Sequence, residues 1–180
     1  MGYKYDERDL LEAAVELVLS EGFSLLTYGR LARRLGLKDR TLVYYFPTKA
    51  DLVKRTVEAL GLRVQVLLAE AFGGSEMSPT ELVARAWPTV SSPEADPIFA
   101  AFLELVGLAA ADREPYRSIA PVAFEEWVSW LTPLVAADDP RAGAQAAVAI
   151  LDGLLLLRHA SSPEAADMAS VALFGRGGRR

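Results

Sequence analysis

The sequence predicts an all-α protein, and three observations support this fold class. Apolar residues recur along almost the whole chain at helical spacing and not in strict alternation. Alanine and leucine are far more common than valine and isoleucine, which favours helices over strands. Most of the 10 prolines separate segments of helical length. About nine helices are therefore expected within 180 residues.

The first two helices are marked by capping residues and glycines. Asp6 is suited to cap a first helix, and Gly22 is placed to end it. Thr27 is suited to cap a second, short helix over residues 28–35, after which Gly36 breaks the chain for a tight turn. These signals predict two helices that pack through their apolar faces.

The third and fourth helices follow directly. A short helix is predicted over residues 39–45, and Pro47 stops it. Thr48 and Asp51 stand three residues apart, a variant of the capping box, and they open a long helix that runs to Phe72.

Prolines and glycines divide the rest of the chain into five further helices. These are predicted near 79–90, 94–112, 115–137, 140–159 and 163–174. The charge and motif patterns described below then suggest a domain over residues 1–47, a second domain over residues 48–174 and a flexible tail over residues 175–180.

Composition excludes several classes of function. The chain has no cysteine and a single histidine, His159, so disulfide scaffolds, thiolate nucleophiles and cysteine or histidine zinc sites are not expected. No phosphate loop, dinucleotide fingerprint or zinc-protease motif is present. The acidic start of the chain does not resemble a secretory signal. We expect a cytoplasmic protein that is not an enzyme, has no cofactor or metal and does not enter a membrane.

The net charge of −5 hides a strong local asymmetry. Between Tyr28 and Arg55 the chain has 8 basic and 2 acidic residues, whereas residues 64–180 have 8 basic and 15 acidic residues. A basic block inside an acidic protein is typical of a local polyanion-binding surface. Two short helices joined by a glycine turn, with a third packed behind them, are also typical of a DNA-binding helix-turn-helix domain.

The segment that carries these features resembles the N-terminal region of TetR-type transcriptional regulators. The resemblance covers about 50 residues, from LLEAAVELVLSEGFSLLTYGRLARRLGLKDR to TLVYYFPTKADLVKRTVEAL. It implies a three-helix DNA-binding domain whose third helix enters the major groove. It further implies a C-terminal helical bundle for ligand binding and dimerisation, whose run Ile150–Leu154 is similar to a dimer-forming helix of that family.

Helical geometry places Arg40, Thr41 and Tyr44 on one face of the third helix, opposite Leu42 and Phe46. Arg40 is the leading candidate to read a base, because its guanidinium pairs well with guanine. Arg30, Arg33 and Arg34 are predicted on the outer side of the second helix, where they would add general attraction for DNA. The full set of expected DNA contacts is Thr27, Tyr28, Lys38, Asp39, Arg40, Thr41, Tyr44, Tyr45 and Lys49.

Three positions depart from the family pattern. Lys38 stands where a small capping residue is usual, Asp39 places a carboxylate at the start of the third helix, and Val43 replaces a tyrosine. Asp39 either complements the helix dipole as the first helical residue or accepts a hydrogen bond from cytosine. The contact that the family makes at Val43 is not carried over.

A regulator that reads two half-sites needs a second copy of the chain, so a homodimer is expected. The predicted dimer interface consists of Ala142, Ala146, Ala149, Gly153, Leu157, Ala166, Ala169, Ser170 and Leu173. In the family the middle helices enclose an effector cavity, and the predicted pocket residues are Trp87, Phe99, Phe102, Leu103, Phe124, Trp127, Trp130 and Leu131. Packing of these aromatic residues into the core is the alternative.

Glu104 and Asp152 interrupt apolar runs. Such a carboxylate finds a partner, stays protonated or touches a ligand. The favoured function is a repressor that leaves a palindromic double-stranded DNA operator when a small apolar ligand binds. The alternative is a helical interaction module in which DNA binding is weak or lost.

Overall fold

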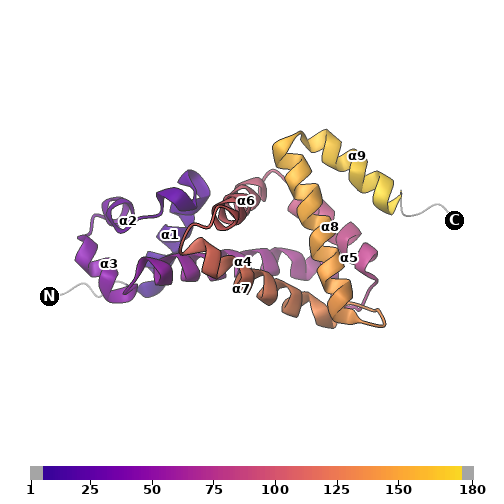
Figure 1. Ribbon diagram of the computed structural model, residues 1–180, viewed down its shortest axis with the longest axis horizontal. Helices are drawn as coiled ribbons and strands as arrows, with labels where there is room; N and C mark the ends of the chain where they lie inside the picture. The colour runs from indigo at the N-terminus through magenta and orange to yellow at the C-terminus, as the bar shows by residue number, and fades with distance from the viewer. Residues whose placement is uncertain (1–5, 176–180) are drawn as a thin grey trace. The chain divides into compact units, whose positions relative to one another are not determined.

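The computed structural model describes residues 6–175, which form nine α-helices and two 3-10 helices without an extended strand (Figure 1). The all-α fold class is therefore confirmed. The helices are α1 (Glu7–Glu21), η1 (Phe23–Leu25), α2 (Tyr28–Leu35), α3 (Asp39–Tyr45), α4 (Lys49–Phe72), α5 (Pro79–Val90), α6 (Asp96–Ala110), α7 (Tyr116–Leu131), η2 (Thr132–Leu134), α8 (Pro140–Ala160) and α9 (Pro163–Phe174). The predicted tail lies outside the described residues, except for Gly175.

The predicted start signals act as expected in the N-terminal helices. The Asp6 carboxylate accepts a hydrogen bond from the backbone N–H of Arg8 at 3.0 Å and caps α1. At the start of α4, the backbone N–H of Thr48 donates to the Asp51 carboxylate at 2.9 Å, and the backbone N–H of Asp51 donates to Thr48 Oγ1 at 3.1 Å. This reciprocal pair is the predicted capping box.

The predicted helix over residues 115–137 is too long, because α7 ends at Leu131. Pro133 has no N–H to continue the helical hydrogen bonds, and the chain tightens into η2. Beyond η2 the backbone N–H of Ala136 donates to the Met77 carbonyl at 2.8 Å, and Met77 N–H donates to the Leu134 carbonyl at 2.9 Å. An isolated parallel bridge thus replaces the last helical turns.

The first compact unit contains residues 1–63 and 100–123. In it α2 packs against α1 and α3. The largest fully buried side chains of this unit are Leu10, Leu17, Phe23, Leu26, Leu31, Leu42, Phe46 and Leu52. The start of α4 and parts of α6 and α7 thus belong to the same unit as the N-terminal helices. The division into functional domains at residue 47 stays a prediction.

The second compact unit contains residues 64–99 and 124–180. Here α8 packs against both α5 and α9. The core of this unit includes Leu82, Val83, Ala86, Leu131, Ala144, Ala147 and Ala166. Within the described part of the chain, α8 is also the one helix long and apolar enough to cross a membrane by length and composition alone.

Candidate nucleic-acid interface

The turn between α2 and α3 is built around Gly36. Its φ of 66° is left-handed, a conformation that glycine adopts without strain, and its N–H donates to the carbonyls of Ala32 and Arg33. The backbone N–H of Leu37 donates to the Ala32 carbonyl at 2.8 Å. The chain therefore leaves α2 in a tight turn, which determines where α3 begins.

Two buried side chains fix α3 to the rest of the unit. Leu42 and Phe46 are both fully buried, as the helical spacing predicts. The Tyr28 hydroxyl donates to the Phe46 carbonyl at 2.7 Å. Burial raises the pKa of Tyr28, and the nearby Asp51 carboxylate raises it further. Because its proton is engaged inside the unit, the hydroxyl does not donate to phosphate; any phosphate contact by Tyr28 uses its backbone at the start of α2.

The outward face of α3 is formed by Asp39, Arg40, Val43 and Tyr44, which are exposed, with Thr41 and Tyr45 half-buried. Tyr44 is 80% exposed and Val43 is 44% exposed. The rings of Tyr44 and Tyr45 meet edge to face with centroids 5.2 Å apart, which supports the orientation of the more exposed ring. Val43 is not among the predicted DNA contacts, but it belongs to this face.

The first residues of α3 clarify the roles of Lys38 and Asp39. Lys38 occupies the N-cap position without a side-chain hydrogen bond, and Asp39 is the first helical residue. The Asp39 carboxylate lies beside the first turn of α2, where a Cβ added to Gly29 would be 3.7 Å from Oδ2. A carboxylate at the start of a helix complements its dipole, so the geometry favours this role for Asp39 over a cytosine contact.

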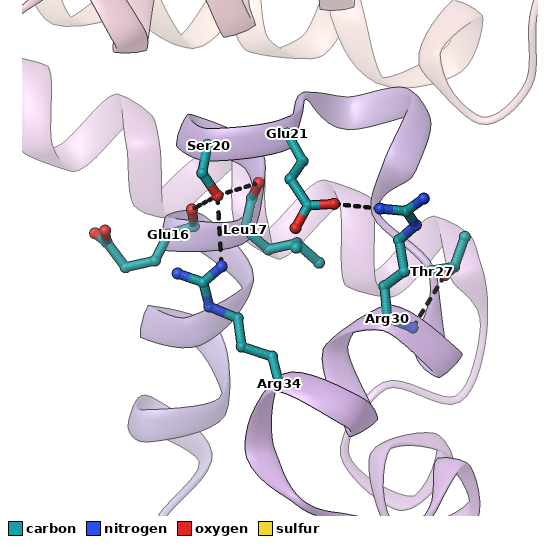
Figure 2. Close-up of polar contacts among 7 residues, drawn as sticks. All are labelled: Glu16, Leu17, Ser20, Glu21, Thr27, Arg30 and Arg34. Atoms are coloured by element: carbon teal, nitrogen blue, oxygen red, sulfur yellow. Dashed lines mark hydrogen bonds and ion pairs between the residues drawn. The ribbon is translucent and has the colours of Figure 1, made fainter.

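Two of the three arginines of α2 contact α1, and Figure 2 shows both. Arg30 forms an ion pair with Glu21. Arg34 Nη1 donates to Ser20 Oγ at 3.4 Å, and that hydroxyl donates to the carbonyls of Glu16 and Leu17. Arg30 and Arg34 thus also attach α2 to α1, and the predicted general attraction of the three arginines for DNA stays a prediction.

The eight basic residues between Tyr28 and Arg55 differ in whether they form an ion pair. Arg30, Lys54 and Arg55 each pair with a carboxylate, that of Glu21, Glu58 and Glu7 respectively. Within residues 6–175 no ion pair involves the remaining cations, and all are exposed: Arg33, Arg34, Lys38, Arg40 and Lys49. They belong to α2, the turn, α3 and the first residue of α4, so the unneutralised positive charge gathers around the helix-turn-helix.

Glu104 of α6 holds the segment that leads from α1 to α2. Its carboxylate accepts hydrogen bonds from the backbone N–H groups of Phe23 at 2.6 Å and Ser24 at 2.9 Å. Gly22 has a φ of 89°, and a Cβ there would overlap this carboxylate. The Tyr116 hydroxyl donates to the Phe23 carbonyl at 2.8 Å. Burial raises the pKa of Tyr116, and the negative charge of Glu104 raises it further. Glu104 therefore takes the first of its three predicted outcomes, a polar partner.

The predicted dimer residues differ in their exposure and divide into three groups. Ala142, Ala146, Ala149, Gly153 and Leu173 are exposed, whereas Leu157 and Ala169 are half-buried. Ala166 and Ser170 are buried in the second unit of the same chain, with exposed fractions of 0% and 7%. These two residues support α9 from inside, and the exposed positions beside them are Met168, Val171 and Leu173.

The predicted pocket residues occur in both units. Phe102 and Leu103 belong to the first unit and are half-buried. In the second unit Trp87 and Leu131 are core residues, and Trp87 Nε1 donates to the Asp167 carboxylate at 3.1 Å. Phe99, Trp127 and Trp130 are partly buried against this core, and Phe124 is half-buried.

The second unit contains a partly buried ion pair that the sequence alone did not predict. The Arg158 guanidinium, 8% exposed, donates from Nε and Nη2 to the two carboxylate oxygens of Asp96 at 2.7 and 2.9 Å. These hydrogen bonds lower the pKa of Asp96. His159 Nε2 lies 4.0 Å from the same carboxylate. An arginine within the apolar stretch of α8 was the available signal, but its partner lies 62 residues away.

Asp152, the second carboxylate in an apolar run, behaves differently from Glu104. Burial alone raises its pKa to about 6. No group of three or more metal-binding side chains is found in the part of the chain that the structure describes.

The fold and this surface define a class: an all-helical protein with a basic helix-turn-helix. Comparisons with known proteins define this class more closely. Residues 10–56 match the family described as bacterial regulatory proteins, tetR family. This match confirms the predicted resemblance of the N-terminal helices to that family. No curated protein matches the sequence significantly.

Solved structures extend the likeness to almost the whole chain. A TetR-family transcriptional regulator from Rhodococcus sp. superposes with a TM-score of 0.73 at 22% identity, covering 92% of this chain and 95% of that chain. A transcriptional regulator from Saccharomonospora viridis in complex with choline superposes with a TM-score of 0.64 at 18% identity, covering 95% of this chain and 96% of that chain. The multidrug binding protein EbrR complexed with imidazole superposes with a TM-score of 0.69 at 22% identity, covering 92% of this chain and 88% of that chain. The chain thus has the fold of TetR-family transcription regulators.

Proposed function

We propose that this protein is a homodimeric transcriptional repressor, active in the cytoplasm, that binds a palindromic DNA operator and releases it when a small apolar ligand binds. The observation that carries the DNA-binding part is the outward face of α3 with its surrounding cations. Arg40 stands on that face, and Arg33, Lys38 and Lys49 surround it without an ion pair among the described residues. Unneutralised charge beside a short exposed helix suits a phosphate backbone and a major groove.

The contacts divide into two kinds. Lys49 begins α4 and is exposed, so it suits a phosphate contact that fixes register without reading sequence. Arg40 projects from α3 and suits guanine. Thr27, Lys38, Tyr44 and Tyr45 complete the proposed contact set, with Thr41 at its half-buried edge.

The dimer is supported by the outward surface of α8 and α9. Along α8 this surface carries Ala142, Ala146, Ala149 and Gly153, and a Cβ added to Gly153 meets nothing within 4 Å. Large apolar side chains are also exposed there: Leu156, Met168, Val171 and Leu173. Covering such a surface with a second copy removes apolar area from water and supplies the second reading head.

Ligand release rests on analogy with structural neighbours, since one is in complex with choline and another is a multidrug binding protein. The half-buried aromatic residues Phe99, Phe124, Trp127 and Trp130 are the proposed ligand contacts in the second unit. A ligand acts only by binding the DNA-free state more tightly than the DNA-bound state.

The test is a gel-shift titration of the full chain against the DNA that flanks its own gene, over a series of salt concentrations. Sequence-selective binding that weakens steeply with salt is expected. Arg40→Ala should relax base preference, whereas Lys49→Ala should weaken all duplexes alike and reduce the salt slope by about 1 per half-site. An unchanged base preference in Arg40→Ala would refute its role. An intact dimer without sequence-selective binding would favour the alternative, a helical interaction module.

A further inference from the structure

We propose that Val43 is a specificity-determining residue that recognises the methyl group of a thymine in the major groove. This inference rests on the proposed DNA-binding function. It gives a thymine-methyl contact to a position where the contact made by the family's tyrosine does not carry over to this chain.

The geometry of α3 places Val43 at the centre of the outward face. Val43 follows Asp39 by four residues and Arg40 by three, so the three side chains lie on neighbouring positions of one face. Tyr44 extends the same face by one turn from Arg40. Leu42, on the opposite face, is fully buried and fixes the rotation of the helix about its axis. Whatever surface Arg40 meets, Val43 meets as well.

The chemistry of the residue restricts what it can recognise. Valine offers neither a donor nor an acceptor, so it makes no hydrogen bond to a phosphate or to a base edge. The major groove presents one prominent apolar group, the C5-methyl of thymine. The other three exposed members of the face, Asp39, Arg40 and Tyr44, are polar or carry a hydroxyl, so Val43 is its one wholly aliphatic side chain.

Local helix preference points in the same direction. A β-branched residue loses side-chain freedom in a helix, and an exposed site gives it less packing in return than a buried one does. Alanine would suit this exposed helical position better. A residue that contradicts the local preference at the centre of a binding face is the pattern expected of a functional site.

The test replaces single thymines by deoxyuridine, which removes the C5-methyl and leaves base pairing intact. Tight-binding duplexes are first selected from a random pool with the full-length protein. Each thymine of the half-site is then replaced in turn, and the ratio of the two Kd values is measured. For the wild type, one position should show a penalty of about fourfold per half-site, the value expected for one buried methyl group.

Three variants assign the contact. Val43→Ala should lose the penalty at that position. Val122→Ala is the matched control, because Val122 is a similarly exposed valine of the first unit that lies on α7, and it should keep both affinity and penalty. Thr41→Ser removes only the methyl group of Thr41, a half-buried residue of the same helix whose methyl group could also meet a thymine, and it should keep the penalty. Circular dichroism checks that each variant retains its helices.

The outcomes are distinguishable. A penalty that persists in full in Val43→Ala, or that disappears in Thr41→Ser instead, overturns the proposal while the DNA-binding function stands. Selected duplexes in which no thymine is sensitive to methyl removal overturn it as well. If the selection yields no sequence-selective duplex, the proposed function fails, and this inference fails with it.

Discussion

The outward faces of α2–α3 and of α8–α9 differ in the side chains that they expose. The first exposes cations without ion pairs among the described residues, including Arg33 and Arg40. The second exposes small residues and large apolar ones, including Gly153 and Met168. The two pairs of helices thus expose surfaces of different chemistry, one cationic and one largely apolar. The predictions below test this difference.

The largest effect is expected from a charge placed on the apolar face. Ala149→Asp would put a carboxylate on each side of the proposed interface, where desolvation and like-charge repulsion oppose association. The variant should become monomeric and lose affinity for a two-half-site duplex by about a hundredfold, the scale of lost avidity. Sedimentation velocity and gel shift measure the two effects.

The matched control is Ala84→Asp, which introduces the same charge at an exposed position of α5 in the same unit. It should remain a dimer and keep its DNA affinity. A dimeric Ala149→Asp protein with wild-type DNA affinity would show that this face does not associate.

The next effect concerns the polar attachment of the first unit. Glu104→Gln removes the charge from a side chain that accepts two backbone hydrogen bonds, from Phe23 and Ser24. The variant's free energy of unfolding, measured by urea titration, should be lower than that of the wild type by about 2 kcal/mol. Glu114→Gln is the control, because Glu114 is exposed and its carboxylate accepts from the hydroxyl of Ser118 one turn away. Equal losses in the two variants would contradict this account of the Glu104 contacts.

Asp152 is a carboxylate within an apolar run of α8, and its stability contribution should depend on pH. Burial raises its pKa from the ordinary value of 3.8 to about 6. Between these two pH values the carboxyl group is protonated in the folded chain and ionised in the unfolded chain. Folding stability contributed by this group therefore falls as pH rises from about 4 to about 6 and stays low above that range. Asp152→Asn should raise stability by about 1–3 kcal/mol at pH 7.5 and leave it unchanged near pH 3.

Thermal melts at the two pH values measure this difference. Asp138→Asn, a substitution at an exposed aspartate, is the control and should show no such pH dependence. A stabilisation of Asp152→Asn that is equal at both pH values would contradict the assigned protonation.

Sequence alone predicted the elements well and the polar contacts poorly, and the reason is physical. Helix ends depend on neighbours within a few residues, so Asp6, Thr48 and Asp51 could be assigned their caps directly. Ion pairs such as Arg158–Asp96 join residues that only the folded chain brings together. Val43 shows the converse case, because its outward position follows from helical spacing alone, three residues after Arg40.

The smallest effect should be the same in both regions. Thr27 caps α2 by accepting from the Arg30 N–H at 3.2 Å, and Ser162 caps α9 by accepting from the Ala165 N–H at 3.1 Å. Thr27→Ala and Ser162→Ala should each lower the free energy of unfolding by about 1 kcal/mol in urea titrations, because a cap is a local interaction that does not depend on the exposed face of its helix. Only Thr27→Ala should also weaken DNA binding. If Ser162→Ala weakened DNA binding as much as Thr27→Ala does, the two surfaces would not be functionally separate.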